Sequence, residues 1–277
     1  MRASEASVAR FAAMGTRVEL HLFGGGAADA LSAAQAAIAA VENALTIHRP
    51  SPTTALNRAL ATGDSAAVDE PLLFDALLQV DALWQQSGGL FDPSLGAWSS
   101  IALDRAAGRV SATQPLTLDF GGFGKGFALD RAVAALRLAG VTHALLSAGE
   151  SSIAVIGQHP LGGAWPFAIP HPEKADAWLV ELEMHDASLS ISSTIGAGAA
   201  KPGRAAMVRP VDGTIVTEPA TAVALAATGA EAEAMSTALL VANPSVADRL
   251  RAADPDRRFR FPHAAPVRAE RPLEPTA

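Results

Sequence analysis

Two kinds of apolar spacing occur along the chain, and together they restrict its fold more than any other feature. Apolar residues recur at helical spacing in five segments, namely 28–48, 69–86, 126–140, 229–242 and 243–253. Short apolar or alternating runs, which are typical of strands, lie at 17–23, 115–120, 143–150, 151–157, 177–184, 187–192, 205–210 and 213–227. Helices gathered early and strands gathered late predict an α+β fold with mixed, largely antiparallel sheets and flanking helices.

Glycine and proline separate several of these segments. Residues 50–60, PSPTTALNRAL, are expected to interrupt the first helix, and residues 87–96, SGGLFDPSLG, to end the second. We find no internal repeat and no change of composition that marks a linker, so residues 1–265 are predicted to form a single interwoven domain. Residues 266–277 are rich in proline and charge, and we expect them to form a tail over the surface.

Composition argues against several classes of function. With 277 residues, 49% hydrophobic and 18% charged, the chain can bury a large core. The net charge is −7 and the basic residues are scattered, unlike the clustered positive surface of a nucleic-acid or anionic-membrane binder. No apolar run reaches the roughly 20 residues of a membrane span and no signal peptide is recognised, so we expect a cytoplasmic protein. Because the chain has no cysteine, any metal must be bound through oxygen or imidazole.

A glycine-rich turn is the most unusual local feature. The stretch LDFGGFGKGFALD, residues 118–130, places four glycines around Lys125 between an expected strand and an expected helix. Backbone amides exposed at a helix N-terminus, with an adjacent ammonium, suit a diphosphate. Alternatively, the glycines only permit a tight turn and close packing of the strand and the helix. The P-loop and dinucleotide fingerprints both fail at this spacing. Asp119 ends the apolar strand, and we expect its carboxylate to be hydrogen-bonded.

This turn resembles the signature D-x-G-G-x-A-K-G-x-x-x-D of the FAD:protein FMN transferases, the ApbE-like flavin transferases. Further matches follow in the family's order, namely MGT at 14–16, TTALN at 53–57, GGLFDPSLG at 88–96, SAGE at 147–150 and AEAMSTALLV at 232–241. The resemblance implies a flavin transferase fold and an enzyme that binds FAD and Mg²⁺, releases AMP, and attaches FMN to a Ser or Thr of a partner flavoprotein. No nucleic-acid or membrane partner is expected.

The resemblance also implies roles for individual residues. Asp119 and Lys125 match the family's flavin-binding aspartate and FAD-contacting lysine and are the first catalytic candidates. His48 takes the place of an aromatic residue that stacks on the cofactor. The implied cofactor pocket comprises Met14, His48, Leu90, Phe91, Asp92, Asp119, Lys125, Met207 and Val208.

A divalent cation is implied at the late helix. The backbone carbonyl of Gly122 and the side chains of Glu233 and Thr237 match the family's metal ligands, and the last two are four residues apart on one helical face. Oxygen ligands of this kind suit Mg²⁺. Where the family has aspartate this chain has Glu233, whose extra methylene moves the carboxylate by roughly 1.5 Å. Without the resemblance, Glu233 reads as a solvated acidic residue near a helix start.

Residues 205–216, AAMVRPVDGTIV, depart from the family's H-I-x-D-P-x-T-G motif. Ala206, Arg209 and Asp212 replace its histidine, aspartate and threonine. Alanine cannot supply a base. Arg209 is a catalytic candidate that pairs with a phosphate, or else a solvated charge before a turn. Three functions therefore remain open: the transferase, an FAD-binding protein that has lost transferase activity, and a metal-dependent FAD pyrophosphatase.

Overall fold

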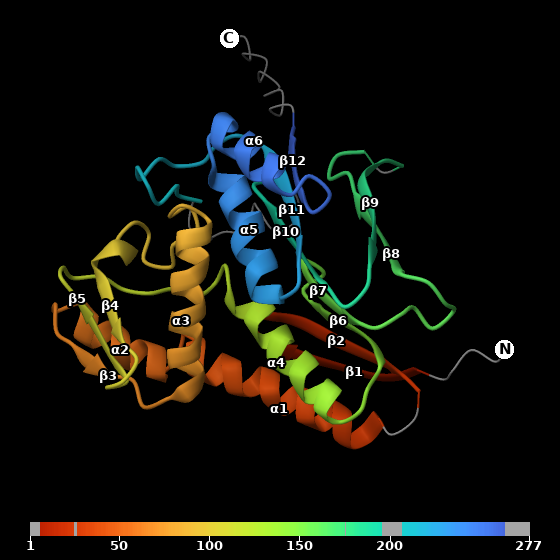
Figure 1. Cartoon of the computed structure of the whole chain (residues 1–277), viewed down its shortest axis with the longest axis horizontal. Coiled ribbons are helices and arrows are strands. Elements are labelled where there is room, and N and C mark those ends of the chain that lie inside the picture. Colours follow the sequence, from red (N-terminus) through yellow and green to blue (C-terminus); the bar gives the residue numbers. More distant parts are fainter. Residues whose placement is uncertain (1–5, 25–26, 175, 196–206, 264–277) are drawn as a thin grey trace, which may run out of the picture.

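An antiparallel sheet of seven strands forms the centre of the protein (Figure 1). The computed structural model describes residues 6–24, 27–174, 176–195 and 207–263. The strands lie side by side in the order β1 (Ala6–Ala13), β2 (Thr16–Phe23), β6 (His143–Ala148), β7 (Ser152–Ile156), β10 (Ser188–Ser193), β11 (Ala220–Ala226) and β12 (Arg258–Pro262). Every strand pairing within the described ranges is antiparallel.

The remaining strands form two smaller sheets. A three-stranded sheet has the order β3 (Ala66–Ala67), β5 (Arg109–Ala112) and β4 (Ile101–Asp104), and a hairpin is formed by β8 (Trp165–Pro170) and β9 (Trp178–Met184). The helices are α1 (Ala27–Leu45), α2 (Pro52–Leu60), α3 (Pro71–Gln86), the 3₁₀ turn η1 (Trp98–Ser100), α4 (Gly124–Leu138), α5 (Gly229–Val241) and α6 (Pro244–Ala253).

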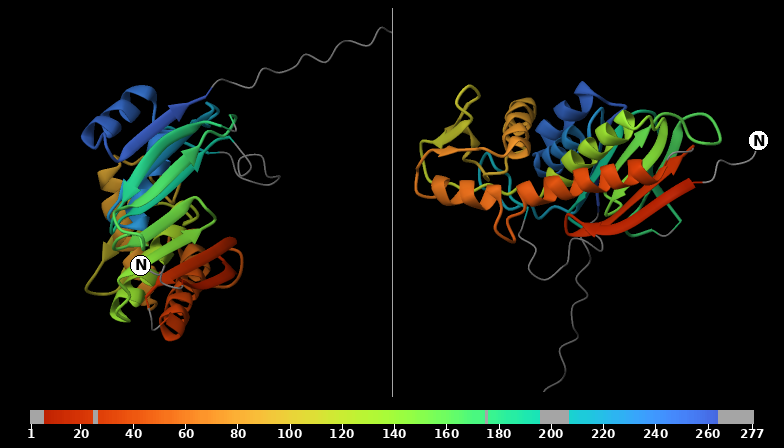
Figure 2. Two further views of the ribbon diagram at one scale, coloured as in Figure 1. Left: turned by 90° about the vertical axis from the view of Figure 1, so that its right-hand side faces the viewer. Right: turned by 90° about the horizontal axis from the view of Figure 1, so that it is seen from below.

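Helices cover one face of the central sheet. Helix α5 packs against β10 and β11, and α4 packs against β6 and β7. Helix α1 lies beside α4 and against β1, as the view from below in Figure 2 shows. The side chains that β11 turns to the helices are all alanine, at positions 220, 222 and 224, and their small size lets α5 approach the sheet closely.

The hairpin β8–β9 covers part of the other face. The alternate residues of the same strands point to it: Val155 of β7 and Val223 of β11 join Trp165 and Met184 of the hairpin in a second buried cluster. The period of two along each strand therefore divides the core into a helix side and a hairpin side. Because helix α5 is enclosed by the sheet, α4 and α6, most of its residues are buried.

Much of the predicted pattern is confirmed. The α+β class with antiparallel sheets holds, and all five predicted helices form, with α3 beginning at Pro71 rather than at residue 69. Helix α6 begins as expected, with Asn243 as its cap, because Asn243 Oδ1 accepts a hydrogen bond from the amide of Val246. The strands expected near 17–23, 143–150, 151–157, 177–184 and 187–192 are all present.

Other predictions fail or hold only in part. Residues 115–120 form no strand, because their backbone bonds the Asn57 side chain, the end of α2 at Leu60 and the loop at Pro93 rather than a neighbouring strand. Residues 50–60 interrupt α1 as predicted, and they also contain an unpredicted helix, α2, which is capped by the side chain of Ser51. Of the strand expected at 213–227 only β11 forms, while Ile215 makes a single bridge to Val208, the one strand-like contact of residues 207–210.

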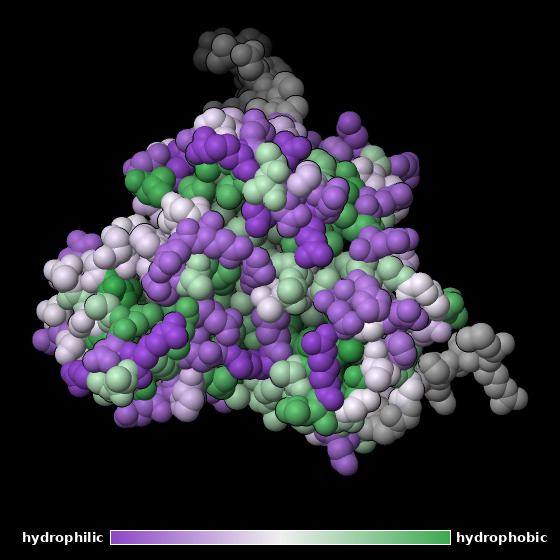
Figure 3. Space-filling view, in the orientation of Figure 1, coloured by the Kyte–Doolittle hydropathy of each residue, from purple (hydrophilic) through white to green (hydrophobic). Residues whose placement is uncertain are grey.

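Strands β1, β3, β4, β5, β8 and β12 were not predicted from the sequence. The proposed boundary at residue 265 and the tail 266–277 lie outside the described residues, so both stay predictions. No helix within the described ranges is long and apolar enough to cross a membrane. Hydrophilic and apolar residues are interspersed on the face shown in Figure 3.

Candidate functional site

The segment before the glycine turn is held by one asparagine. Asn57 on α2 accepts a hydrogen bond from the amide of Leu118 and donates one to its carbonyl oxygen, both at 2.8 Å. The next amide, that of Asp119, donates to the carbonyl of Pro93. These bonds satisfy an extended backbone without a strand partner. Asn57, the last residue of the TTALN match, thus fixes the entry to the turn.

The turn itself is tightly hydrogen-bonded. Asp119 is exposed, and its Oδ1 accepts a 2.8 Å bond from the amide of Gly121, as expected for a hydrogen-bonded carboxylate. The amides of Phe123 and Gly124 both donate to the carbonyl of Phe120. Three amides that were candidates for an anion are therefore engaged within the turn, and binding of a phosphate by Lys125 stays a prediction.

Close contact between α4 and α5 explains one of the glycines. A Cβ atom on Gly126 would lie 2.1 Å from the carbonyl oxygen of Gly229, so only glycine fits there. Asp130, one turn further along α4, accepts hydrogen bonds from the amides of Gly229 and Ala230 at 2.6 and 2.9 Å. Its carboxylate therefore satisfies two free donors at the N-terminus of α5.

Burial dominates the electrostatics of Asp130. It raises the pKa of that carboxyl to about 6, although the two amide hydrogen bonds from Ala230 and Gly229 act in the opposite direction. The negative charges of Glu233 and Glu231 add to the rise. Asp130 is the last aspartate of the turn's signature. Its carboxylate joins α4 to the N-terminus of α5 rather than facing a surface that could bind a ligand.

The joined helices bring Lys125 to Glu233. Lys125 Nζ lies 2.7 Å from Glu233 Oε1, and the lysine side chain is 24% exposed whereas that of Glu233 is 3% exposed. The same oxygen accepts a 2.5 Å bond from the hydroxyl of Ser152 on β7. Glu233 is thus a buried carboxylate with two donors, and the solvated role it would have as an ordinary helix residue is wrong.

One oxygen of this carboxylate has no donor among the described residues. Glu233 Oε2 is buried and makes no hydrogen bond with them, an arrangement that costs free energy unless another group binds there. Thr237 follows one turn later on the same face of α5, and a Cβ atom built on Gly122 would lie 3.5 Å from Thr237 Oγ1. The structure therefore brings together Gly122, Glu233 and Thr237, which sequence analysis assigned to a metal.

The donor set fits a hard cation. Within the described ranges no cluster of three or more His, Asp or Glu residues could hold a metal, so a cation here would use one carboxylate together with a hydroxyl and a carbonyl oxygen. Mg²⁺ is commonly held by one or two carboxylates plus substrate phosphates. Oε2, which has no partner among the described residues, would supply the one charged ligand of such a site.

Met14 and Phe91 lie near the glycine turn. Met14 has a left-handed φ of 54° in the tight turn between β1 and β2, where its amide donates to Glu42 Oε1. A Cβ atom on Gly124 would lie 2.9 Å from the methyl carbon of Met14, which places that side chain over the turn. The ring of Phe91 lies 6.2 Å from that of Phe123.

Three other candidates for the cofactor pocket have different surroundings. Leu90 is buried in a cluster with the C-terminal half of α5. Asp92 is also buried, and its carboxylate accepts bonds from the backbone of Ser94, Gly96 and Trp98, which shapes the following loop. His48 is exposed between α1 and α2. Their roles in cofactor binding stay predictions.

Residues 207–216 of the divergent segment form a short hairpin, whereas Ala206 lies outside the described residues. Met207 packs against apolar clusters, and Val208 pairs with Ile215. Arg209 Nε donates to the carbonyl of Val241 at 2.7 Å, and its Nη1 lies 3.0 Å from Asp212 Oδ2. Arg209 therefore ties the hairpin to the end of α5, and its predicted contact with a phosphate stays a prediction.

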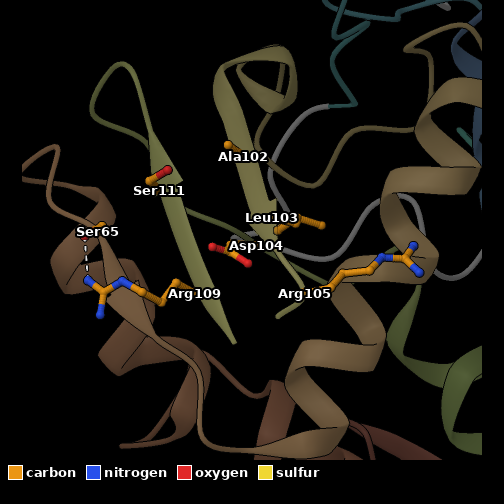
Figure 4. Close-up of a pocket in the computed structure, with 7 residues that line it drawn as sticks. All are labelled: Ser65, Ala102, Leu103, Asp104, Arg105, Arg109 and Ser111. Atoms are coloured by element: carbon orange, nitrogen blue, oxygen red, sulfur yellow. Dashed lines mark hydrogen bonds between the residues drawn. The ribbon is translucent and has the colours of Figure 1, made fainter. Parts of the chain in front are cut away.

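Two surface hollows lie apart from the ion pair. One of about 680 Å³ is formed on the three-stranded sheet, where Arg109 donates to Ser65. The side chain of Asp104 lies between β4 and β5 (Figure 4). None of the predicted site residues lines this hollow. A second of about 660 Å³ adjoins the β1–β2 turn and includes Gly15 and Glu42, neighbours of Met14. The candidate site is therefore identified by its charged and polar side chains rather than by the size of a hollow.

Comparison with known proteins agrees with the motifs. The model of the ApbE family matches residues 14–102 and 97–258, which is most of the chain. The chain belongs to the ApbE family. Its fold is similar to that of the flavin transferase ApbE of Vibrio cholerae, with a TM-score of 0.78, 14% identity, and coverage of 94% of this chain and 97% of the other. The ApbE protein of Thermotoga maritima gives a TM-score of 0.79 at 18% identity, covering 93% and 94%.

A curated ApbE relative is more similar over a shorter stretch. The FAD:protein FMN transferase of Rhodobacter capsulatus is 33% identical over 153 residues. That match covers 44% of this chain and 29% of the relative, so less than a third of the relative's length is matched.

Sequence reasoning missed three residues that organise the site. Asn57 and Asp130 were quoted within motifs without a role, although a polar residue that ends a motif is a candidate for such a backbone contact. Ser152 was not singled out, because a serine in an apolar strand gives no local sign that a carboxylate 81 residues later will reach it.

Proposed function

We propose that this chain is a Mg²⁺-dependent FAD:protein FMN transferase, which moves FMN from FAD to a Ser or Thr of a partner flavoprotein and releases AMP. The observation that carries the proposal is the buried carboxylate of Glu233, which has Lys125 on one oxygen and, within the described ranges, no partner on the other. A diphosphate needs a fixed positive charge and a cation on its oxygens, and this pair of residues can provide both. Family membership supports flavin nucleotides as the substrate class.

Each residue contributes a binding or positioning task. Lys125 would contact the diphosphate with its ammonium. Glu233 Oε2, Thr237 Oγ1 and the Gly122 carbonyl would hold Mg²⁺, which when bound neutralises charge on the phosphate oxygens. Met14 and Phe91, the latter beside Phe123, would border the flavin. Asp119, exposed at the start of the turn, would meet polar atoms of the cofactor.

The reaction is a phosphoryl transfer. The hydroxyl oxygen of the acceptor Ser or Thr would bond to the phosphorus of the FMN half, and the bond from that phosphorus to the bridging oxygen would break. AMP then leaves with the bridging oxygen, and the hydroxyl proton passes to solvent. Catalysis of this kind rests mainly on positioning and charge, so it tolerates an alanine at position 206 where the family has histidine.

The decisive experiment combines the full chain with FAD, Mg²⁺ and an acceptor domain bearing a D-G-x-[ST]-G-A-[ST] segment. Mass spectrometry should show one FMN added to the acceptor, with AMP formed in equal amount. AMP without an adduct would instead identify an FAD pyrophosphatase. Saturable FAD binding without AMP would identify a binding protein that has lost the activity. Either result would contradict the transferase.

A further inference from the structure

We infer that Ser152 is a positioning residue of the proposed metal site, which fixes Oε1 of Glu233 so that Oε2 remains for the cation. The inference rests on the proposed function, because it concerns the metal of that site. Ser152 begins β7 and is 1% exposed, so its hydroxyl must find its partner inside the protein.

Both donors to the carboxylate select the same oxygen. The hydroxyl of Ser152 lies 2.5 Å from Glu233 Oε1, and Lys125 Nζ lies 2.7 Å from it. Oε2 is buried and has no partner in the part of the chain that the structure describes. If Lys125 turns to a diphosphate, Ser152 is the donor that continues to hold Oε1. The serine therefore keeps the carboxylate oriented in the state in which the cation and the nucleotide are bound, as partners of metal ligands commonly do.

The length of Glu233 makes this contact possible. An aspartate at this position would withdraw the carboxylate by about one carbon–carbon bond, roughly 1.5 Å, and a 2.5 Å hydrogen bond would then be stretched beyond bonding range. A glutamate also has one more rotatable bond than an aspartate, so it needs an added constraint to present one oxygen in a fixed place. Ser152 provides that constraint.

Neighbouring serines provide a matched control. Ser190 on β10 lies directly opposite Ser152 in the sheet and is also buried. Its hydroxyl accepts a 3.0 Å bond from Ser236, which also bonds the hydroxyl of Ser192. These hydroxyls bond one another and the backbone carbonyl of Glu233 rather than its carboxylate. Removal of Ser190 thus deletes a buried hydroxyl of the same strip without touching Oε1.

The test is a calorimetric titration of the full chain with Mg²⁺ at one pH in the presence of saturating FAD. We expect Ser152→Ala to weaken Mg²⁺ binding about tenfold or more. Ser152→Cys keeps a similar side-chain volume with a weak donor and should also weaken it, which covers the case in which the alanine variant does not fold. Ser190→Ala should bind Mg²⁺ with nearly the affinity of the unmodified chain.

A double-mutant cycle tests whether Ser152 acts through Glu233. In a Glu233→Asp background the carboxylate no longer reaches the serine, so Ser152→Ala should change Mg²⁺ affinity by less than about twofold there. Equal effects of Ser152→Ala in both backgrounds would overturn the inference, and so would unchanged Mg²⁺ binding in both Ser152 variants. If the unmodified chain still binds FAD, neither result contradicts the proposed function. A lack of saturable FAD binding by the unmodified chain would overturn both.

Discussion

Lys125 Nζ and Glu233 Oε1 lie 2.7 Å apart although 108 residues separate them in the chain. Replacing Lys125 by methionine leaves Ser152 as the only donor to the carboxylate among the described residues. Because Lys125 is partly exposed, we expect the free energy of unfolding to fall by less than for a fully buried pair, roughly 2–3 kcal/mol. Denaturant unfolding in the absence of metal measures this loss. The double variant Lys125→Met with Glu233→Gln, which removes both charges, should recover part of it. A single variant as stable as the unmodified chain would contradict the account of the pair.

Gly126 and Gly124 differ in what a methyl group would meet. In Gly126→Ala the new carbon would lie 2.1 Å from the Gly229 carbonyl oxygen, so α4 and α5 must separate and the melting temperature should fall by several degrees or more. In Gly124→Ala it would meet only the mobile end of Met14, and the loss should be small. Thermal unfolding followed by circular dichroism compares the two variants. Equal losses would contradict the proposed close contact of the helices.

Asp130 should make stability fall with rising pH. The pKa of its carboxyl is about 6 in the folded chain, whereas the ordinary value is 3.8. Between these pH values the unfolded chain has therefore released a proton that the folded chain retains. The contribution of Asp130 is therefore lost as the pH rises from about 4 to 6, by on the order of 2–3 kcal/mol. Asparagine cannot titrate there. The difference in unfolding free energy between the unmodified chain and Asp130→Asn should shrink across this window, and a constant difference would contradict the raised pKa.

Arg209 should act on stability more than on phosphate binding. Its Nε bonds the carbonyl of Val241 and its Nη1 pairs with Asp212, so Arg209→Ala should cost about 1–2 kcal/mol of unfolding free energy. Arg251→Ala, which breaks only the exposed pair with Asp248, serves as the control and should cost less than about 0.5 kcal/mol. Loss of FAD affinity in Arg209→Ala without loss of stability would instead support a direct contact with phosphate.

The strongly periodic segments were predictable because their packing repeats along the chain. Helix α3 shows this, since Leu73, Leu77 and Val80 recur at helical spacing and are all buried. Segments stabilised by distant partners were not predictable. The strand expected at 115–120 is missing because Asn57, 61 residues earlier, supplies the hydrogen bonds that a neighbouring strand would have supplied. Strand β12 was missed because it pairs at the edge of the sheet with β11.

The candidate site was predictable in its residue types and less so in their partners. Motif order indicated Lys125, Glu233, Thr237 and Gly122, and the fold brings these residues together. Burial of Glu233 could not be read from an alanine-rich helix with an acidic first turn, because it results from packing of α5 against the sheet and α4. The hydrogen bond from Ser152 to Glu233 depends on the register of β7 beneath α5, which no local pattern encodes.

The most direct test of the central claim is a titration of the full chain with FAD, with and without Mg²⁺, for the unmodified protein and Glu233→Ala. If a cation bound by Glu233 assists Lys125 in holding the diphosphate, Mg²⁺ should raise the FAD affinity of the unmodified chain about tenfold and leave that of Glu233→Ala unchanged. FAD binding that does not respond to Mg²⁺ in the unmodified chain, or that responds equally in both proteins, would contradict the account.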